Sequence, residues 1–483
     1  MAQLDNIPNE ILRHIFTYVS DTNHSSIFNV ILVNKHFNQI ATPLRVRHWS
    51  DEGYYGYYHG SSPCPPISRL ALELLRHPEY RLQVKSLSFS WFQSSHDRDP
   101  ARVPLSSENL QMLAWAAEEL VPTLAETTYL CAKILEDNDD AIAVVVLAWA
   151  TNLTSLSITV PFFDPTPNDG EGSIVLRFAK QLALRFSTDD PKPSAPLPLA
   201  KLRDLEFRHN DTEDDVALKY FSPFFYLPSL KNVKAYRLGD QESNDSEETV
   251  QRYINDSYCM PLPKGTSSIE SIILEETTLS SDGLKSLLSA PKALKTFKLE
   301  LCSTAVYSET WETALANSLF HHAASLEELD LCSNLTYPFG TSPSDDVMSL
   351  KDCYGHLTSL KRLSISLLDV FYFSPDEVNP GNQDLLYNPD LLPESIGHLK
   401  LCDSDLFCGC RDSRERDYHD CEISFYLMAL GVITDAAGPQ RRLRNLKVID
   451  CSQSLRDDPK VEMIQEVKES AKKQDITLLL RAM

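Results

Sequence analysis

The sequence contains little glycine, fewer basic than acidic residues, and no long apolar run. Only 15 of the 483 residues are glycine, and we find no Gly-rich phosphate loop, His-Glu-x-x-His helix or nucleophile elbow. Lysine and arginine together number 45 against 68 acidic residues, a formal net charge of −23. Phosphate backbones and anionic membranes bind clustered Lys and Arg, so a nucleic acid or a membrane is not expected as partner. We expect a non-catalytic protein without a cofactor.

No stretch approaches the ~20 apolar residues that a bilayer-spanning helix needs. The opening residues MAQLDNIPNE carry acids where a secretory signal carries Lys or Arg before an apolar run. These features predict an intracellular protein, in the cytoplasm, the nucleus or both. The 11 cysteines are then expected to be reduced thiols that pack as small apolar residues.

One group of side chains could build a tetrahedral zinc site from thiolates and an imidazole. Its members are Cys402, Cys408, Cys410, His419 and Cys421. The Cys-x-Cys spacing differs from the usual Cys-x-x-Cys knuckle, and the last cysteine follows at a distance. We therefore favour reduced thiols in a loop and predict no metal site.

The length exceeds the ~250–300 residues that one hydrophobic core usually supports, which indicates several domains or a stacked repeat array. Three regions are indicated: a compact motif at 1–50, a linker at 51–66 and a repeat region at 67–483. The linker is marked by Gly and Pro between tyrosines, a composition typical of irregular connections.

The first region has the apolar spacing of short helices. Ile7, Ile11, Ile15 and Val19 recur every four residues, which predicts a helix with a broad apolar face. The polar run at 21–26 ends this helix, and two further apolar runs predict two more. Three helices this short bury too little surface to be stable alone, so we expect an apolar face to be left for a partner.

This region resembles the F-box motif in the order and spacing of Ile7-Pro8-Asn9-Glu10-Ile11-Leu12, Ile15-Phe16, Tyr18-Val19, Leu32-Val33-Asn34-Lys35 and Phe37. F-box helices bind the small Skp-type adaptor of a cullin–RING ubiquitin ligase. The resemblance implies that the adaptor-facing or motif-core positions are Pro8, Ile11, Leu12, Ile15, Val33 and Phe37. Ile7 and Asn29 depart from the family, which usually has Leu and an apolar residue there. Alternatively, these residues form the first helical hairpin of the repeat region and cap its core.

Behind the motif a short pattern recurs: apolar, two residues, apolar, one residue, apolar. Copies begin at Val84, Leu153, Leu202, Leu230, Ile269, Leu294, Leu326, Leu360, Ile396 and Leu443. Helical segments separate most copies. A strand and a helix recurring every ~25–50 residues predict an α/β fold, a leucine-rich-repeat-like solenoid with a curved parallel sheet. The region resembles the irregular leucine-rich repeats that follow F-boxes in many fungal proteins.

In such strands the apolar residues face the core, and the residues between them point outward onto the concave face. The expected outward stripe is Glu206, Arg208, Lys234, Tyr236, Glu275, Lys298, Glu300, Asp330, Ser364 and Lys400. Both charges and an aromatic ring occur in it. This mixture suits a protein substrate better than a small molecule.

Two functions fit these features. In the first, the chain is the substrate-recognition subunit of an SCF-type cullin–RING ubiquitin ligase, with the F-box on the Skp adaptor and the solenoid on a substrate protein. In the second, it is a leucine-rich-repeat scaffold with an F-box-like motif and no role in ubiquitin delivery. Recovery of cullin and RING components with a client protein separates the two.

Overall fold

The computed structural model describes residues 7–51, 67–89, 104–120, 127–160, 173–187, 197–209, 215–240, 260–302, 309–331, 350–366, 371–372, 386–387, 391–402, 416–438, 441–453, 455 and 462–481. The expected linker, apart from Asp51, lies outside these residues. The chain divides into two compact units: unit 1 is Met1–Ala235 with Glu242–Pro263, and unit 2 is Tyr236–Gln241 with Lys264–Met483. Each unit is α/β and is built on a parallel sheet.

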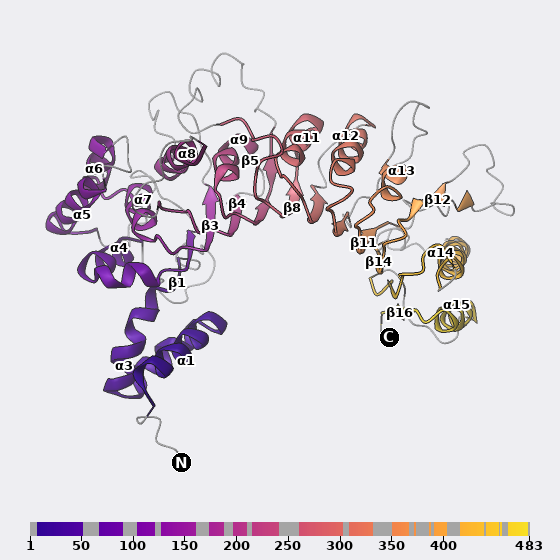
Figure 1. Cartoon of the computed structure of the whole chain (residues 1–483), viewed down its shortest axis with the longest axis horizontal. Helices are drawn as coiled ribbons and strands as arrows, with labels where there is room; N and C mark the ends of the chain where they lie inside the picture. Colours follow the sequence, from indigo (N-terminus) through magenta and orange to yellow (C-terminus); the bar gives the residue numbers. More distant parts are fainter. Residues whose placement is uncertain are drawn as a thin grey trace. The chain divides into compact units, whose positions relative to one another are not determined.

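Unit 1 begins with three helices and continues with strands separated by helices (Figure 1). Its main elements are α1 (Asn9–Thr22), α2 (Ser25–Val33), α3 (Lys35–Ala41), η2 (Thr42–Val46), β1 (His48–Ser50), α4 (Ile67–Arg76), η3 (Pro78–Gln83), β2 (Ser86–Phe89), α5 (Ser107–Glu119), α6 (Thr127–Leu135), α7 (Asp139–Trp149), β3 (Ser155–Val160), α8 (Ile174–Ser187), β4 (Asp204–His209), β5 (Val216–Ala217), α9 (Leu218–Phe221), η5 (Ser222–Tyr226) and β6 (Asn232–Tyr236).

The sheet of unit 1 has the strand order β1-β2-β3-β4-β6, and every pair is parallel. The register places one buried residue of each strand in a row: Trp49, Leu87, Leu156, Leu205 and Val233. These are the central apolar positions of the recurring pattern, together with one tryptophan. The pattern therefore marks the residues that stack into the core.

Strand β1 differs from the sequence-based expectation. It occupies the last three residues of the range assigned to the N-terminal motif, yet it pairs with β2. The sheet therefore begins inside that range. Trp49 is the one apolar residue of β1, so the strand does not show the full pattern and was not predicted.

Unit 2 repeats the alternation of strand and helix, and its helices lie along one side of the strands (Figure 1). Its elements are β7 (Leu238–Gly239), β8 (Ser271–Thr277), α11 (Ser281–Ser289), β9 (Thr296–Leu301), α12 (Glu309–Phe320), β10 (Glu328–Asp330), α13 (Leu350–Tyr354), β11 (Arg362–Ile365), β12 (Phe371–Tyr372), β13 (Leu386–Tyr387), β14 (His398–Leu401), α14 (Arg416–Ala436), β15 (Val448–Asp450), α15 (Glu462–Lys473) and β16 (Thr477–Leu479).

The parallel sheet of unit 2 runs β8-β9-β10-β11-β14-β15-β16. Its central row is Ile272, Phe297, Leu329, Leu363, Leu399, Ile449 and Leu478, and all except the last are buried. Helices tie neighbouring repeats together: the Trp311 indole N–H donates to the Leu279 carbonyl at 3.0 Å. Buried His322 bridges two further backbone groups, because its ring nitrogens lie 2.8 Å from the Leu288 carbonyl and 3.4 Å from the Leu294 amide.

The expected copy of the pattern beginning at Leu443 is wrong by three residues. Strand β15 begins at Val448, and its buried positions are Leu446, Ile449 and Cys451. Leu443 is also buried, so two overlapping stretches fit the same template. The hydrogen bonds to β14 decide between them, because the amides of 447 and 448 both donate to the Gly397 carbonyl.

This paired hydrogen bond recurs at the start of almost every strand. In unit 1 the Arg47 carbonyl accepts from the amides of 85 and 86, and the Lys85 carbonyl accepts from 154 and 155. In the same way the Thr154 carbonyl accepts from the amides of 203 and 204, and the Arg203 carbonyl accepts from the amides of 231 and 232. The accepting residue thus stands at an equivalent place in each repeat. We call these residues the strand-start row; in unit 1 it is Arg47, Lys85, Thr154 and Arg203. We add Lys231, whose amide donates to the Arg203 carbonyl, because the β4–β6 register gives it the equivalent place in the next repeat.

Candidate functional site

The three N-terminal helices have a hydrophobic core of their own. Its buried members are Leu12, Phe16, Ile27, Phe37, Ile40, Ala41 and Leu44. The rings of Phe16 and Phe37 meet edge to face with centroids 5.1 Å apart, a favourable aromatic geometry. Ile7, Val30 and Ile31 pack against this cluster from its margin. We call α1, α2 and α3 with this core the helical unit.

Local sequence explains where these helices begin and end. The Pro8 carbonyl accepts from the amides of Ile11 and Leu12, both at 3.0 Å, at the first turn of α1, a position that tolerates proline. Asn34 stands in extended conformation between α2 and α3, and its side chain accepts from the Phe37 amide at 2.7 Å. Asparagine is among the best residues for this cap. The Val33-Asn34-Lys35 element is therefore a helix stop followed by a helix start.

Outside this core the helical unit exposes large apolar side chains. In α1 these are Ile11, Ile15 and Tyr18, which are 49%, 42% and 70% exposed and lie at i, i+4 and i+7 on one stripe. In α2 they are Phe28, Leu32 and Val33, at 48%, 81% and 64%. Six of the thirteen exposed large apolar residues in the described part of the chain thus lie in two short helices. Such concentrations mark interaction surfaces, and we call these six residues the exposed apolar set.

Some of the positions implied by the F-box resemblance are exposed, and the others lie in the core of the helical unit. Pro8, Ile11, Ile15 and Val33 are exposed, whereas Leu12 and Phe37 are only 1% and 5% exposed and lie in the core of the helical unit. The last two are therefore core positions of the helical unit. Tyr18, Phe28 and Leu32 belong to the exposed set but were not singled out. Their spacing of three or four residues from other apolar positions was the available signal.

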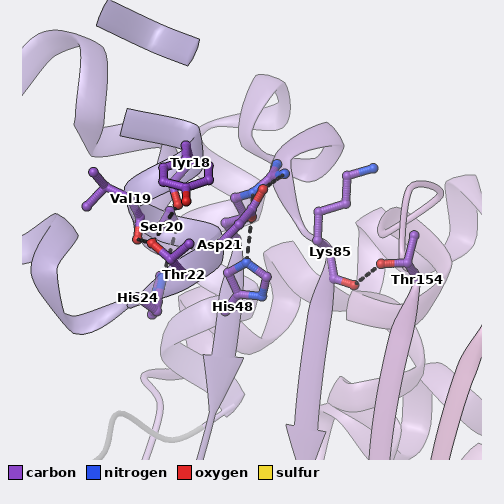
Figure 2. Close-up of polar contacts among 10 residues, drawn as sticks. Tyr18, Val19, Ser20, Asp21, Thr22, His24, His48, Lys85 and Thr154 are labelled. Carbon is purple, nitrogen blue, oxygen red and sulfur yellow. Dashed lines mark hydrogen bonds and ion pairs between the residues drawn. The ribbon is translucent and has the colours of Figure 1, made fainter. Parts of the chain in front are cut away.

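A charged junction ties α1 to the first strand. Asp21, near the end of α1, accepts from Arg47 at 2.5 and 2.9 Å and lies 2.9 Å from the His48 ring (Figure 2). The hydrogen bond from Arg47 holds the pKa of the Asp21 carboxyl below its usual range. Two-pronged arginine–carboxylate pairs fix orientation as well as distance. This junction orients the helical unit relative to the sheet of unit 1.

A histidine completes the junction from the side of α2. The His24 ring lies 5.5 Å from the His48 ring and 5.6 Å from the Phe28 ring, measured between centroids. Ser20 contacts its Nδ1 at 3.1 Å. Burial lowers the pKa of His24, and the neighbouring His48 acts in the same direction. The His24 ring thus contacts both the exposed Phe28 and His48 of the junction.

The outward residues of unit 1 lie on the sheet face opposite the core. Glu206, Arg208 and Lys234 are half-buried and flank the buried positions of β4 and β6. Glu206 accepts from Arg208 at 3.0 Å and forms an ion pair with Lys234 at 3.6 Å. These three expected substrate-binding residues are therefore brought together, with the one carboxylate of Glu206 between two cations.

In unit 2 the expected outward residues also alternate with buried ones. They are Tyr236, which ends β6 and is the first residue of unit 2, with Glu275, Lys298, Glu300, Asp330, Ser364 and Lys400, and all are half-buried. Burial raises the pKa of Glu300, and Glu275, Glu276 and Asp330 raise it further. This face therefore gathers acids around Glu300.

Glu328 is a member of the outward face that the sequence analysis missed. It lies 2.7 Å from Lys298 and 2.5 Å from Arg362. Its place one residue before the central apolar position of β10 was the available signal. It joins three strands of unit 2 by charge.

The suggested cysteine cluster is described only in part. Cys402 is disulfide-bonded, which differs from the expectation of reduced thiols, whereas Cys131, Cys302, Cys353 and Cys451 are free thiols. Cys408, Cys410 and the side chains of His419 and Cys421 lie outside the described residues.

Within the described residues, no three His, Cys, Asp or Glu side chains are placed to hold a metal ion. None of the described helices combines the length and apolar character needed to cross a bilayer. No protein-family model matches this chain, and no curated protein matches it either.

Proposed function

We propose that this chain is an F-box substrate receptor of an SCF-type cullin–RING ubiquitin ligase. In this proposal the helical unit binds the Skp-type adaptor, and the strand-and-helix repeats, as a leucine-rich-repeat-like solenoid, bind the substrate protein. The observation that carries the proposal is the exposed apolar set on α1 and α2, beside a core that the helices complete by themselves.

The exposed set supports a docking role because it has a cost without a partner. Leu32 and Val33 leave most of their side chains in water, although burial of such a residue contributes ~1.5–3 kcal/mol. The neighbouring Leu12 and Phe16 already fill the core of the helical unit. A groove on a partner that accepts apolar helix residues would recover this free energy. The F-box resemblance names such a partner.

The repeats support the substrate-binding half of the proposal. Each repeat adds one parallel strand whose central residue is buried between its neighbours, so no repeat is complete alone. The outward faces then present charged and polar side chains in fixed register. A fixed, mixed-charge surface is suited to recognising another protein.

No bond-making step is required of this chain. A receptor accelerates ubiquitin transfer by holding the substrate near the ubiquitin-loaded partner, which raises the effective concentration of the reacting groups. The alternative, a scaffold that holds the adaptor without delivering ubiquitin, shares the first contact and lacks the second. The two functions are distinguished by whether the cullin, the RING subunit and a client protein are recovered together with the chain.

The test is co-purification of the full chain with a Skp-type adaptor. The double variant Ile11→Asp, Ile15→Asp places two carboxylates in the apolar stripe of α1, and we expect it to lose the adaptor. Leu135→Asp with Leu184→Asp is the matched control, because these residues, both 46% exposed, lie in α6 and α8. Adaptor binding that survives in the first variant, with the helical unit folded, contradicts the proposal.

A second arm of the test addresses ubiquitin delivery. Cullin and RING subunits should be recovered with the wild-type chain, together with a client whose lifetime shortens when the chain is present. Recovery of the adaptor alone, with no cullin and no such client, favours the scaffold.

A further inference from the structure

The strand-start row of unit 1 is basic, although the chain as a whole is acidic. Its members Arg47, Lys85, Arg203 and Lys231 are interrupted only by Thr154. Lys201, two residues before Arg203, adds a cation beside the row, with its ammonium 2.6 Å from the Asn152 side-chain oxygen. Adjacent parallel strands are ~4.8 Å apart. The row therefore sets cations along a line across successive strands.

The equivalent row in unit 2 has a different charge pattern. There Lys295 pairs with Glu270 at 2.6 Å, and Lys361 pairs with Glu327 at 2.6 Å. Lys447 lies 3.2 Å from Asp475. Each of these lysines thus has a carboxylate beside it. The position itself does not require an unpaired charge.

Three cations of unit 1, in the row or beside it, lack this compensation, whereas Arg47 pairs with Asp21. Among the described residues, Lys85, Lys201 and Arg203 form no ion pair; the nearby Asp21 is engaged by Arg47 and His48. The Asp204 carboxylate accepts a hydrogen bond from the Asn232 side-chain nitrogen at 2.6 Å. Figure 2 shows the Lys85 side chain extending away from Asp21, with its backbone carbonyl bonded to Thr154.

Repulsion within the row is visible in one pKa. Burial lowers the pKa of Lys85, and the neighbouring charges of Arg47 and Lys201 lower it further, against a smaller opposing effect of Asp21. Like charges held together in this way favour a bound anion, because the anion removes their mutual repulsion.

We propose that Lys85, Lys201 and Arg203 bind a short acidic segment of a partner polypeptide. The backbones of Lys85 and Arg203 lie two strand spacings apart, ~10 Å, and an extended peptide rises ~3.4 Å per residue. Three or four residues of an extended peptide therefore span the distance from Lys85 to Arg203, and a few more residues reach Lys231. Carboxylates along such a segment meet one cation after another.

A polypeptide fits this row better than a nucleic acid. The formal charge of −23 repels a long polyanion, and tight binding to a nucleic-acid backbone uses ~6–10 phosphate contacts. A short acidic peptide needs only the row. This contact is independent of the exposed apolar set, so it does not depend on the proposed adaptor.

The test measures binding of a fluorescent peptide of about six glutamates, long enough to span the row, to the full chain by fluorescence anisotropy at low salt. The neutral glutamine peptide and a single-stranded DNA of equal charge are compared with it. We expect the glutamate peptide alone to bind appreciably, and added salt to weaken that binding. Tighter binding of the DNA than of the peptide overturns the proposal.

Two variants locate the site. Lys85→Glu with Arg203→Glu should weaken binding of the glutamate peptide about tenfold or more, because two exposed pairs are lost and two repulsions gained. Lys295→Glu with Lys361→Glu in unit 2 is the control for charge, because it changes the net charge by the same amount, and it should bind almost as the wild type does. Equal weakening by both overturns the proposal. Lys85→Gln with Arg203→Gln gives the same comparison if the reversal disturbs folding, and retained adaptor binding separates this result from the proposed function.

Discussion

Replacing Leu32 and Val33 by glutamine should weaken adaptor binding far more than folding. These residues are 81% and 64% exposed, and complete burial of a large aliphatic side chain contributes ~1.5–3 kcal/mol. Covering the exposed fractions therefore contributes about 2–4 kcal/mol to docking. The expected loss of affinity lies between about thirtyfold and about a thousandfold. The smaller parts already in contact with the helical unit account for roughly 1 kcal/mol of its stability.

Calorimetric titration of the full chain with a purified Skp-type adaptor measures this loss. Circular dichroism and hydrogen exchange of the variant show whether α1 to α3 remain folded. The matched control is Leu135→Gln with Leu184→Gln, which removes exposed apolar surface from α6 and α8. An adaptor affinity equal to that of the wild type, in a folded Leu32 and Val33 variant, would refute the placement of the docking surface.

Three other outcomes follow from buried groups. Phe16→Ala should cost the helical unit about 3–5 kcal/mol, seen as lost hydrogen-exchange protection in α1 to α3 while β9 keeps its protection. Burial raises the pKa of Asp140, whose carboxylate caps α8, to about 6 from 3.8, so folding takes up a proton in that window. Stability relative to Asp140→Asn should then rise as pH falls from 7 towards 4, as urea unfolding would show. The Cys353 thiol is fully buried with a pKa of about 12, and iodoacetamide should label it only after unfolding, as read by mass spectrometry.

Much of the parallel sheet was predictable from the recurring apolar pattern. The central residue of each copy, such as Leu87 or Leu363, is a buried residue that stacks on its neighbours. The register error at Leu443 arose because apolar residues three apart satisfy the template twice. Only the hydrogen bonds to β14 distinguish the two, and these depend on residues far away in sequence.

Roles within the helical unit were harder to predict. Ile11 and Leu12 are adjacent and equally apolar, yet one is half-exposed and the other is buried. A broad apolar face does not say which of its edges meets the core, because that depends on how α1 packs on α2 and α3. The apolar spacing therefore indicated which region forms helices with an apolar face, but not which of its residues are buried and which are exposed.

Charge pairing was the least predictable feature. The second position of the recurring pattern is basic in both units: it is Lys85, Arg203 and Lys231 in unit 1, and Lys295 and Lys361 in unit 2. These lysines and arginines look alike in sequence. Whether each has a carboxylate neighbour depends on the residue at the same position one repeat away, so it is readable only after the repeats are aligned in register.

The central claim is that a partner covers the exposed apolar set of the helical unit. Hydroxyl-radical footprinting of the full chain, alone and with the Skp-type adaptor, measures this directly at single side chains. We predict that oxidation of Tyr18, Phe28 and Leu32 falls on adaptor binding while Trp115, which is 58% exposed in α5, reacts as before. Unchanged oxidation of the first three residues in a saturated complex would contradict the claim.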